Sequence, residues 1–402
     1  MVDDFLRVPY GSTVHGDEEI DAVVDVLRSS TQMGSRVSKF ESKIAEIFCK
    51  DHGVMTNSGT SALFLAIESL NLEPGSEVIT PVLTFATTVG CLVKNGLVPV
   101  FVDVGESTFC INHRAIESKI TGKTKAILAP DLLGNLCNWQ EIRALADKYS
   151  LLVLQDSADT LGAKLNGKDT GSFSDLSITS FYGSHIINGA GNGGMLCSDN
   201  LQVVDKSRLL RSWGRSSSLF KDSEAIENRF NISLSGIPYD AKFVFEEIGY
   251  QLEPSEISAA FGLIQLGKLS ENLRRRREIF DLHLKFFSGY EDYFIRPKET
   301  EGSYTGWLAF PIQLKEDVCF ERKELQIFLE KRNIQTRVVF TGNILRQPGF
   351  KNIHCIGKAD DFPQADLVMK NGMLLGCHHG LNESQLAHIH DSIKIFIDQK
   401  IF

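Results

Sequence analysis

The chain has 402 residues, of which 43% are hydrophobic and 23% are charged, a composition typical of a folded globular protein with room for two domains. Its formal net charge of −9 argues against nucleic acid as a partner, so phosphate groups must be recognised by a local site. The eight cysteines form no CxxC or CxC pair, the first residues lack a signal-peptide pattern, and no apolar run is long enough for a membrane span, so we expect reduced thiols and a cytoplasmic location.

Two amphipathic helices are predicted in residues 17–49, where apolar side chains such as Ile20, Val23 and Leu27 repeat with the helical period. Short apolar strands and helices then alternate as far as residue 197, which predicts a mainly parallel sheet covered on both faces. The predicted strands are residues 77–80, 98–104, 125–129, 151–155, 176–182 and 194–197, with helices at 60–70 and 141–149.

The pattern changes after about residue 255. The predicted elements there are helices at 255–269, 274–287, 323–331 and 383–398, and strands at 307–312 and 336–340. We therefore predict an α/β large domain over residues 1–270, including the N-terminal helices, and a smaller C-terminal α+β domain over residues 271–402. The four arginines of residues 274–277 are predicted to lie on a solvated helix face.

Three motifs of the first domain have the residue types of a ligand site. Small residues in Ser58-Gly59-Thr60-Ser61 precede a predicted helix, where free N–H groups bind phosphate, although a plain helix cap has the same pattern. Phe85 follows a strand and offers an aromatic face, with a core phenylalanine as the alternative. Asp156 ends a predicted parallel strand, where α/β sheets place ligand contacts, and a helix cap is again the alternative.

The segment Ser180-Phe181-Tyr182-Gly183-Ser184-His185, followed by glycine-rich residues 186–194, resembles the cofactor loop of a pyridoxal-phosphate (PLP) enzyme. Such enzymes hold PLP as a Schiff base on a lysine amine, and His185 stands at the lysine position. An imidazole cannot form that bond, but it moves protons near neutral pH. The exchange therefore indicates a reaction other than ordinary transamination.

Taken in order, the motifs SGTSAL, PVLTFATT, QDSADTLGA and SFYGSH resemble the DegT/DnrJ/EryC1/StrS sugar aminotransferase family over nearly the whole chain. The resemblance implies the α/β fold-type-I PLP-dependent aminotransferase fold, a homodimer, and PLP or pyridoxamine phosphate (PMP) as cofactor. It implies phosphate contacts from Gly59, Thr60, Ser61 and Ser180, ring stacking by Phe85, and contact of Asp156 with the ring nitrogen. Gln251 lies in the loop that family members donate to the neighbouring subunit, without the basic residue usual there.

His185, the segment Ser212-Trp213-Gly214-Arg215 and residues 336–348 resemble the nucleotide-sugar 3-dehydratase subgroup of this family. That resemblance implies that His185 is the catalytic base in the removal of the C3 hydroxyl from a nucleotide-linked 4-keto-6-deoxyhexose, in 3,6-dideoxysugar biosynthesis. L-glutamate would be the amino donor. Arg215, Arg337 and Arg346 are the predicted contacts to substrate phosphates or sugar, with a surface ion pair as the alternative for each.

One branch of the subgroup, the CDP-4-keto-6-deoxyglucose 3-dehydrases, carries a [2Fe–2S] cluster on four cysteines. Counted from Asp156, those positions are occupied by Ala158, Ser216, Ser218 and Ile226, none of which supplies a thiolate. We therefore expect no cluster and no other metal, and favour the branch of the GDP-4-keto-6-deoxymannose 3-dehydratases. The alternatives are a reductase-coupled dehydrase of CDP- or dTDP-4-keto-6-deoxyglucose and a non-catalytic, cofactor- or sugar-binding regulatory member. No motif distinguishes GDP, CDP and dTDP sugars.

Overall fold

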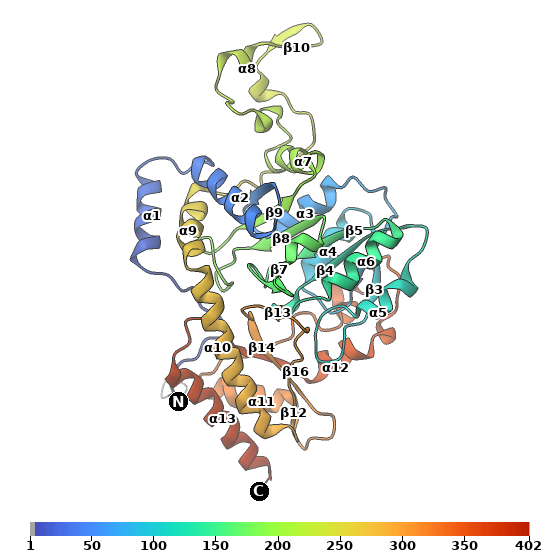
Figure 1. Cartoon of the computed structure of the whole chain (residues 1–402), viewed down its shortest axis with the longest axis vertical. Helices are drawn as coiled ribbons and strands as arrows, with labels where there is room; N and C mark the ends of the chain where they lie inside the picture. Colours follow the sequence, from blue (N-terminus) through green and yellow to red (C-terminus); the bar gives the residue numbers. More distant parts are fainter. Residues whose placement is uncertain (1–4, 402) are drawn as a thin grey trace.

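The chain is built around two separate sheets, and the computed structural model describes it over residues 5–401 (Figure 1). A seven-stranded sheet is formed by residues 52–198 and a four-stranded sheet by residues 294–376. None of the helices in the described residues is long and apolar enough to cross a membrane.

The two helices predicted at the start are α1 (Asp17–Leu27) and α2 (Ser35–Ile47). Both pack against α9 (Glu256–Gly267), and α2 buries Phe40 and Ile44. The Glu256 carboxylate accepts hydrogen bonds from the N–H groups of Gly34 (2.7 Å) and Val37 (2.9 Å). A distant side chain therefore satisfies donors that the first turn of α2 leaves free.

The seven-stranded sheet is mainly parallel, as predicted. Its strand order is β1 (His52–Thr56), β9 (Gly194–Ser198), β8 (Leu176–Ser180), β5 (Leu152–Asp156), β4 (Thr124–Pro130), β2 (Glu77–Pro81) and β3 (Val98–Val102). Only β9 runs antiparallel to its neighbours. Six of these strands were predicted from the sequence, and β1 was not.

Helices cover both faces of this sheet. One face packs on α6 (Trp139–Tyr149), and the other packs on α3 (Gly59–Ser69), α4 (Ala86–Lys94) and α7 (Leu201–Arg211). Successive residues of one strand separate accordingly, since Ile79 joins the first core and Val78 the second. Two buried faces explain why the strands are continuously apolar rather than alternating.

The second sheet is antiparallel and has the order β12 (Phe294–Ile295), β14 (Ala309–Leu314), β16 (Gly372–Gly376) and β15 (Arg337–Val338). Its helices are α10 (Leu269–Phe287), α11 (Arg322–Lys331), α12 (Pro363–Asn371) and α13 (Glu383–Ile401). The strand predicted at 336–340 is shorter because Phe340 has a φ of 41°, which a strand does not tolerate. The central strand β16 was not predicted.

The division at residue 270 remains a proposal. Residue 270 is the second residue of α10, so the boundary falls inside a continuous helix. At the start of the chain, a parallel bridge between Val8 and Ile334 brings residues of the predicted large domain onto the C-terminal part.

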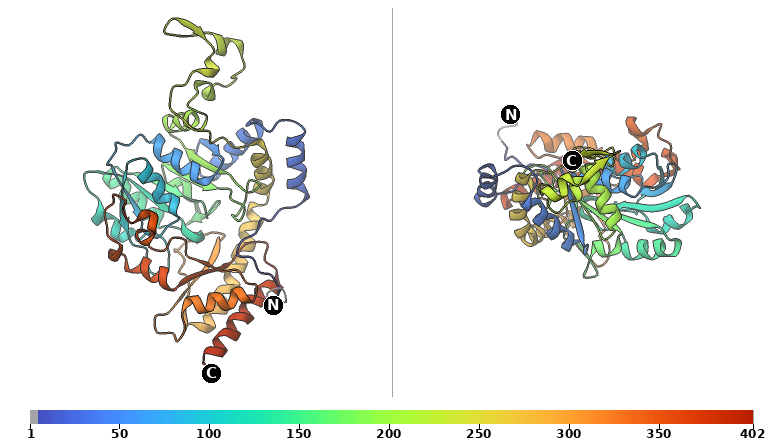
Figure 2. Two further views of the ribbon diagram at one scale, coloured as in Figure 1. Left: turned by 180° about the vertical axis from the view of Figure 1, so that it is seen from behind. Right: turned by 90° about the horizontal axis from the view of Figure 1, so that it is seen from above.

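The remaining elements are short: α5 (His113–Ile116), and a three-stranded sheet of β13 (Ser303–Tyr304), β6 (Lys164–Leu165) and β7 (Lys168–Asp169). Residues 220–248 form an arm that contains α8 (Ile226–Phe230) and the hairpin β10 (Ile232–Leu234) and β11 (Ile237–Tyr239). The arm projects away from the body of the molecule, on the side opposite the C-terminus (Figures 1 and 2).

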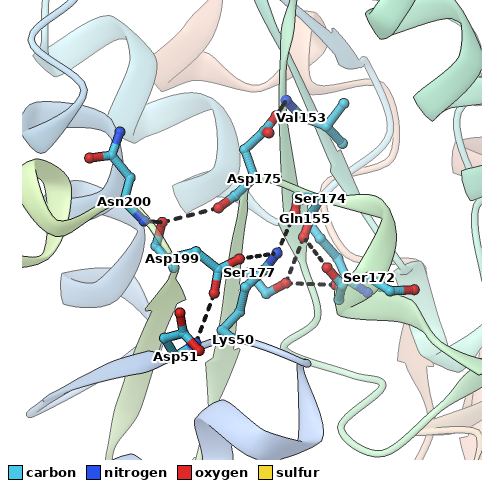
Figure 3. A network of polar contacts seen from close by, with 12 residues as sticks. Lys50, Asp51, Val153, Gln155, Ser172, Ser174, Asp175, Ser177, Asp199 and Asn200 are labelled. Atoms are coloured by element: carbon cyan, nitrogen blue, oxygen red, sulfur yellow. Dashed lines mark hydrogen bonds and ion pairs between the residues drawn. The ribbon is translucent and has the colours of Figure 1, made fainter.

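A polar network closes the edge of the main sheet at which β5 and β8 begin (Figure 3). The Lys50 ammonium donates to the carbonyl oxygen of Ser174 (2.7 Å) and pairs with Asp199 (3.3 Å). Asp175, just before β8, accepts the N–H of Val153 (2.7 Å). The charged and polar groups at this edge are therefore paired with one another by hydrogen bonds and an ion pair. The cavity described next lies at the opposite edge, where the strands end.

Candidate active site

A cavity of about 470 Å³ lies where β5 and β8 end. Ligands of parallel α/β sheets bind at this edge. Leu308 and Phe340 of the C-terminal part complete its wall, so both parts of the chain contribute. Six sequence-predicted residues line it: Gly59, Thr60, Phe85, Asp156, Ser180 and His185.

The N-terminus of α3 forms one end of the cavity. Ser58 caps the helix by accepting the N–H of Ser61 (3.1 Å), whereas the N–H groups of Gly59 and Thr60 belong to the first turn, where no helical carbonyl is within reach. A Cβ on Gly59 would lie 2.7 Å from the Cβ of Ser180, so only glycine lets the helix approach β8 this closely. The helix dipole, the free N–H groups and the Ser180 hydroxyl make an anion site that fits a phosphate.

The carboxylate of Asp156 lies at the end of β5, buried in the cavity wall. It accepts hydrogen bonds from the Thr88 hydroxyl (2.9 Å) and the Ala158 N–H (3.2 Å). Burial raises the pKa of Asp156 to about 6, since neither partner carries a positive charge. A buried carboxylate without a cation fits a protonated ring nitrogen. Phe85 is 53% exposed beside it, which leaves its ring free for stacking.

The imidazole of His185 faces the cavity in a defined orientation. Its Nδ1 lies 3.1 Å from the carbonyl oxygen of Ser180, which accepts only, so Nδ1 carries the proton and Nε2 has the lone pair. Burial lowers the pKa of His185 to about 4. At neutral pH the side chain is therefore an unprotonated base.

Asp159 faces this base, with Oδ1 at 4.0 Å from Nε2 of His185. That separation is too long for a hydrogen bond. The other carboxylate oxygen accepts the N–H of Leu133 (2.9 Å). Burial raises the pKa of Asp159 to about 7, so the carboxyl group holds or releases a proton near neutral pH.

Three aromatic side chains of the cavity wall were not among the predicted site residues: Tyr10, Tyr182 and Phe340. Tyr182 meets the His185 ring edge-on, with centroids 5.8 Å apart, and Phe340 meets Phe85 in the same way at 5.7 Å. Tyr182 and Phe340 lie in motifs that the sequence had singled out. Tyr10 is brought to the cavity by the pairing of the N-terminal segment with the C-terminal part, in which Val8 bridges to Ile334 and the Tyr10 N–H donates to Gln335 (3.1 Å).

The prediction of a solvated arginine run is wrong for one residue. Arg274 and Arg277 pair with carboxylates at the helix surface, but Arg276 is 0% exposed and lies behind the His185 loop. The buried residues of α10 recur at Leu273, Arg276, Phe280 and His283, which is the inward stripe of the helix. That periodicity was the available signal, and the charge of the run concealed it.

The other predicted site residues lie outside the cavity wall. The Ser61 hydroxyl donates to Asn57 Oδ1 (2.6 Å). Arg337 lies over the ring of Tyr10, 5.5 Å from its centroid, and thus next to the cavity. Arg346 is already bound to Asp366 (2.6 Å) and Asp360 (2.9 Å). Two further predicted residues, Arg215 and Gln251, line a separate hollow of about 780 Å³ at the base of the arm.

In the part of the chain that the structure describes, no group of three or more His, Cys, Asp or Glu side chains is arranged to hold a metal ion. The absence of an iron–sulfur cluster remains a prediction from the four positions without cysteine.

The fold and the cavity are those of the PLP-dependent, sugar-modifying enzymes. The chain belongs to the DegT/DnrJ/EryC1/StrS aminotransferase family, whose model matches residues 14–394. This confirms the family and the fold predicted from the motifs, and PLP is the cofactor on which the family depends.

Relatives within the family include 3-dehydratases. The lipopolysaccharide biosynthesis protein RfbH of Salmonella typhimurium is 34% identical over 396 residues, covering 95% of this chain and 90% of that protein. A dTDP-4-dehydro-2,6-dideoxy-D-glucose 3-dehydratase of Saccharopolyspora spinosa is 33% identical over 400 residues, covering 97% and 86%. The solved structure of Escherichia coli GDP-4-keto-6-deoxy-D-mannose-3-dehydratase with bound hydrated PLP matches with a TM-score of 0.87 at 28% identity, covering 96% and 99%. The chain is therefore similar to enzymes that remove a sugar hydroxyl as well as to aminotransferases.

Proposed function

We propose that this protein is a PLP/PMP-dependent 3-dehydratase of a nucleotide-linked 4-keto-6-deoxyhexose, with His185 as its catalytic base. The observation that carries the proposal is the histidine at the lysine position, in a cavity whose described wall includes no lysine. The phosphate end, the ring-nitrogen carboxylate and the stacking face are all retained. Loss of the lysine is therefore better explained by a changed reaction than by a lost activity.

Different residues of the cavity would bind different parts of the cofactor. The first turn of α3 and Ser180 would hold the phosphate, Asp156 would keep the ring nitrogen protonated, and Phe85 would stack on the ring. When bound, the cofactor supplies an electron-withdrawing ring that acidifies the adjacent C–H bond. Because position 185 offers no amine, no covalent bond from this residue would hold the cofactor.

His185 would move the protons. Its Nε2 lone pair faces the cavity and accepts a proton, and the resulting imidazolium then gives that proton to the departing C3 hydroxyl, which leaves as water. The hydrogen bond from Nδ1 to the Ser180 carbonyl oxygen keeps the ring in this orientation through both transfers. Asp159, 4.0 Å away, would stabilise the imidazolium while it exists.

The overall reaction balances without an external reductant. The keto sugar loses one oxygen and is reduced by two electrons, and glutamate is oxidised to 2-oxoglutarate with release of ammonia. The oxygen lost from the sugar is equivalent to the one that 2-oxoglutarate gains through water. L-glutamate is thus the amino donor and the source of electrons, which is consistent with a chain that lacks the four cluster cysteines.

Arg337 is the strongest of the predicted substrate contacts, because it lies beside Tyr10 at the cavity. Arg346 is the weakest, since two aspartates already occupy its guanidinium group. We propose no particular nucleotide for the substrate, because the relatives described above are named for dTDP and GDP sugars.

The projecting arm supports a homodimer. Its apolar side chains face solvent in the single chain, including Ile226, Phe230, Ile237, Phe245 and Ile248, the last of which is 96% exposed. Such a surface needs a partner, and we propose a second copy of this chain as that partner.

The same dimer would give Arg215 and Gln251 a site. Both line the hollow at the base of the arm and not the cavity of their own chain. In a dimer in which each arm packs against the other subunit, Arg215 and Gln251 would contact the cofactor and substrate bound by that other subunit. Ile248→Asp in the arm is then expected to yield monomers in sedimentation, whereas Leu27→Asp, exposed on α1, leaves the dimer intact. A monomeric wild-type protein contradicts the proposal.

The function is tested with purified protein, PLP, L-glutamate and the GDP-, CDP- and dTDP-linked 4-keto-6-deoxyhexoses. One of the three sugars is expected to give a 3-deoxy product by NMR, together with free ammonia. A stable amino sugar as the product identifies an aminotransferase instead. Failure of the protein to bind either form of the cofactor supports a non-catalytic member of the family.

A further inference from the structure

Arg276 connects the loop that carries His185 to three other segments. The side chain extends from the inward face of α10 and is fully buried. One terminal nitrogen donates to the carbonyl oxygens of Ser184 (2.9 Å) and His185 (3.1 Å). The other donates to those of Trp307 (3.3 Å) and Leu308 (3.1 Å), just before β14.

The fifth donor of the guanidinium group is also used, since Nε–H donates to Nδ1 of His379 (3.2 Å). A guanidinium group has five N–H donors in a fixed plane, and here each has an acceptor. None of these acceptors is a carboxylate. A cation buried without an ion pair is costly, so its presence here calls for a role beyond packing.

We propose that Arg276 is a positioning residue: its guanidinium group holds the Ser184 and His185 peptide groups so that Nε2 of His185 faces the cavity, and it places a positive charge directly behind the imidazole. The inference rests on the proposed function in taking His185 as the base. The carbonyl oxygens that Arg276 binds belong to the residue with the imidazole and to its neighbour, so a shift of this contact moves the base itself.

The charge of Arg276 acts on His185 together with other groups. The titratable groups around His185 are Asp156 at the end of β5, Asp159 just after it, Tyr182 on the loop of His185, Tyr10 of the N-terminal segment, and Arg276 of α10. Those that face Arg276 are Tyr10, Asp159, Cys377, His378 and His379. Burial is the main cause of the lowered pKa of His185, and the nearby charge of Arg276 lowers it further. Burial lowers the pKa of Arg276 only to about 10, so the guanidinium group stays charged at neutral pH.

The test follows the His185 imidazole directly, by NMR titration of the PLP-loaded, full-length protein with ¹³Cε1-labelled histidine. The His185 signal is assigned by its absence from His185→Asn. In the wild-type protein it is expected to remain neutral down to about pH 4. In Arg276→Gln it is expected to titrate at a higher pH, because the neighbouring positive charge is gone, and the acid limb of the pH–rate profile shifts in the same direction.

Arg276→Lys separates position from charge. Lysine keeps the charge but has only three donors, so the His185 titration is expected to match wild type while turnover falls about 100-fold through misplacement of the base. The matched control is Arg274→Gln, which removes the same charge from the same helix at an exposed site paired with Glu271 and Glu278. It is expected to leave both titration and turnover unchanged.

Three results overturn the inference: a wild-type His185 signal that titrates near 6.5, an Arg276→Gln titration identical to wild type, or full turnover in Arg276→Lys. The first and third need no variant that removes the buried charge. If the wild-type protein converts no sugar, the proposed function fails while the titration result still decides whether Arg276 controls His185.

Discussion

Replacement of Asp156 by asparagine removes a negative charge from the cofactor cavity while keeping the shape of the side chain. In the structure, two of the carboxylate's acceptor sites are used by the Thr88 hydroxyl and the Ala158 N–H, and the remainder face the cavity. We expect the variant to fold normally and to bind PLP more weakly, because a neutral amide no longer holds the proton on the ring nitrogen.

The size of the effect follows from the kind of bond that is lost. A hydrogen bond to a charged group contributes about 1.5–3 kcal/mol, which corresponds to a roughly 10- to 150-fold weaker dissociation constant. Because position 185 offers no amine, no Schiff base to this residue contributes to affinity, and equilibrium dialysis measures the dissociation constant of the non-covalent complex directly. The pKa of about 6 adds a second expectation: wild-type affinity declines below pH 6 as Asp156 becomes protonated, and that decline is absent from the variant.

Thr88→Val is the matched control, since it removes a hydrogen bond to Asp156 (2.9 Å) and leaves the charge in place. It is expected to weaken binding by less than about tenfold, the value of one ordinary hydrogen bond. Equal affinity of Asp156→Asn and wild type, or an equal loss in both variants, refutes the role of the charge.

Three further predictions concern other parts of the molecule. Gly59→Ala places a Cβ 2.7 Å from that of Ser180, so the variant is expected to lose PLP affinity and thermal stability together in dialysis and melting experiments; an unchanged protein contradicts the close approach of α3 to β8. His185→Asn is expected to abolish dehydration with PLP affinity retained, and residual turnover would assign the base elsewhere. The pKa of His390 is lowered by burial to about 4, so from pH 6.5 downward the unfolded chain binds a proton that the folded chain does not, and stability falls. His390→Phe is expected to reduce the loss of unfolding free energy between pH 7.5 and 5.5 by about 1 kcal/mol in urea titrations, and parallel pH dependences would refute it.

Residues at the ends of parallel strands could be predicted from the sequence. Asp156 and Ser180 end β5 and β8, and His185 follows five residues later, so a correct strand prediction brings them to one edge of the sheet. The motif at Gly59 could be predicted for the same reason, because adjacent residues in the sequence define the start of α3. The predicted groups at the ends of β5 and β8 and at the start of α3 therefore do line the cavity.

Long-range features could not be predicted in the same way. Tyr10 reaches the cavity through a bridge between residues 8 and 334, and no local pattern encodes that pairing. Phe340 was expected in a strand but adopts a positive φ and turns into the wall. Arg276 was missed because a run of charge is usually solvated, and only the helical period separates the inward arginine from its neighbours.

The central claim is that this cavity couples removal of the C3 hydroxyl to glutamate oxidation. The most direct measurement is the stoichiometry of a reaction that contains only the protein, PLP, L-glutamate and the accepted 4-keto-6-deoxyhexose nucleotide, with no electron donor or reductase. The account predicts equal amounts of 3-deoxy sugar, ammonia and 2-oxoglutarate, and none of the sugar product with His185→Asn. An amino sugar formed without ammonia, or a 3-deoxy product formed only after a reductase and its electron donor are added, contradicts it.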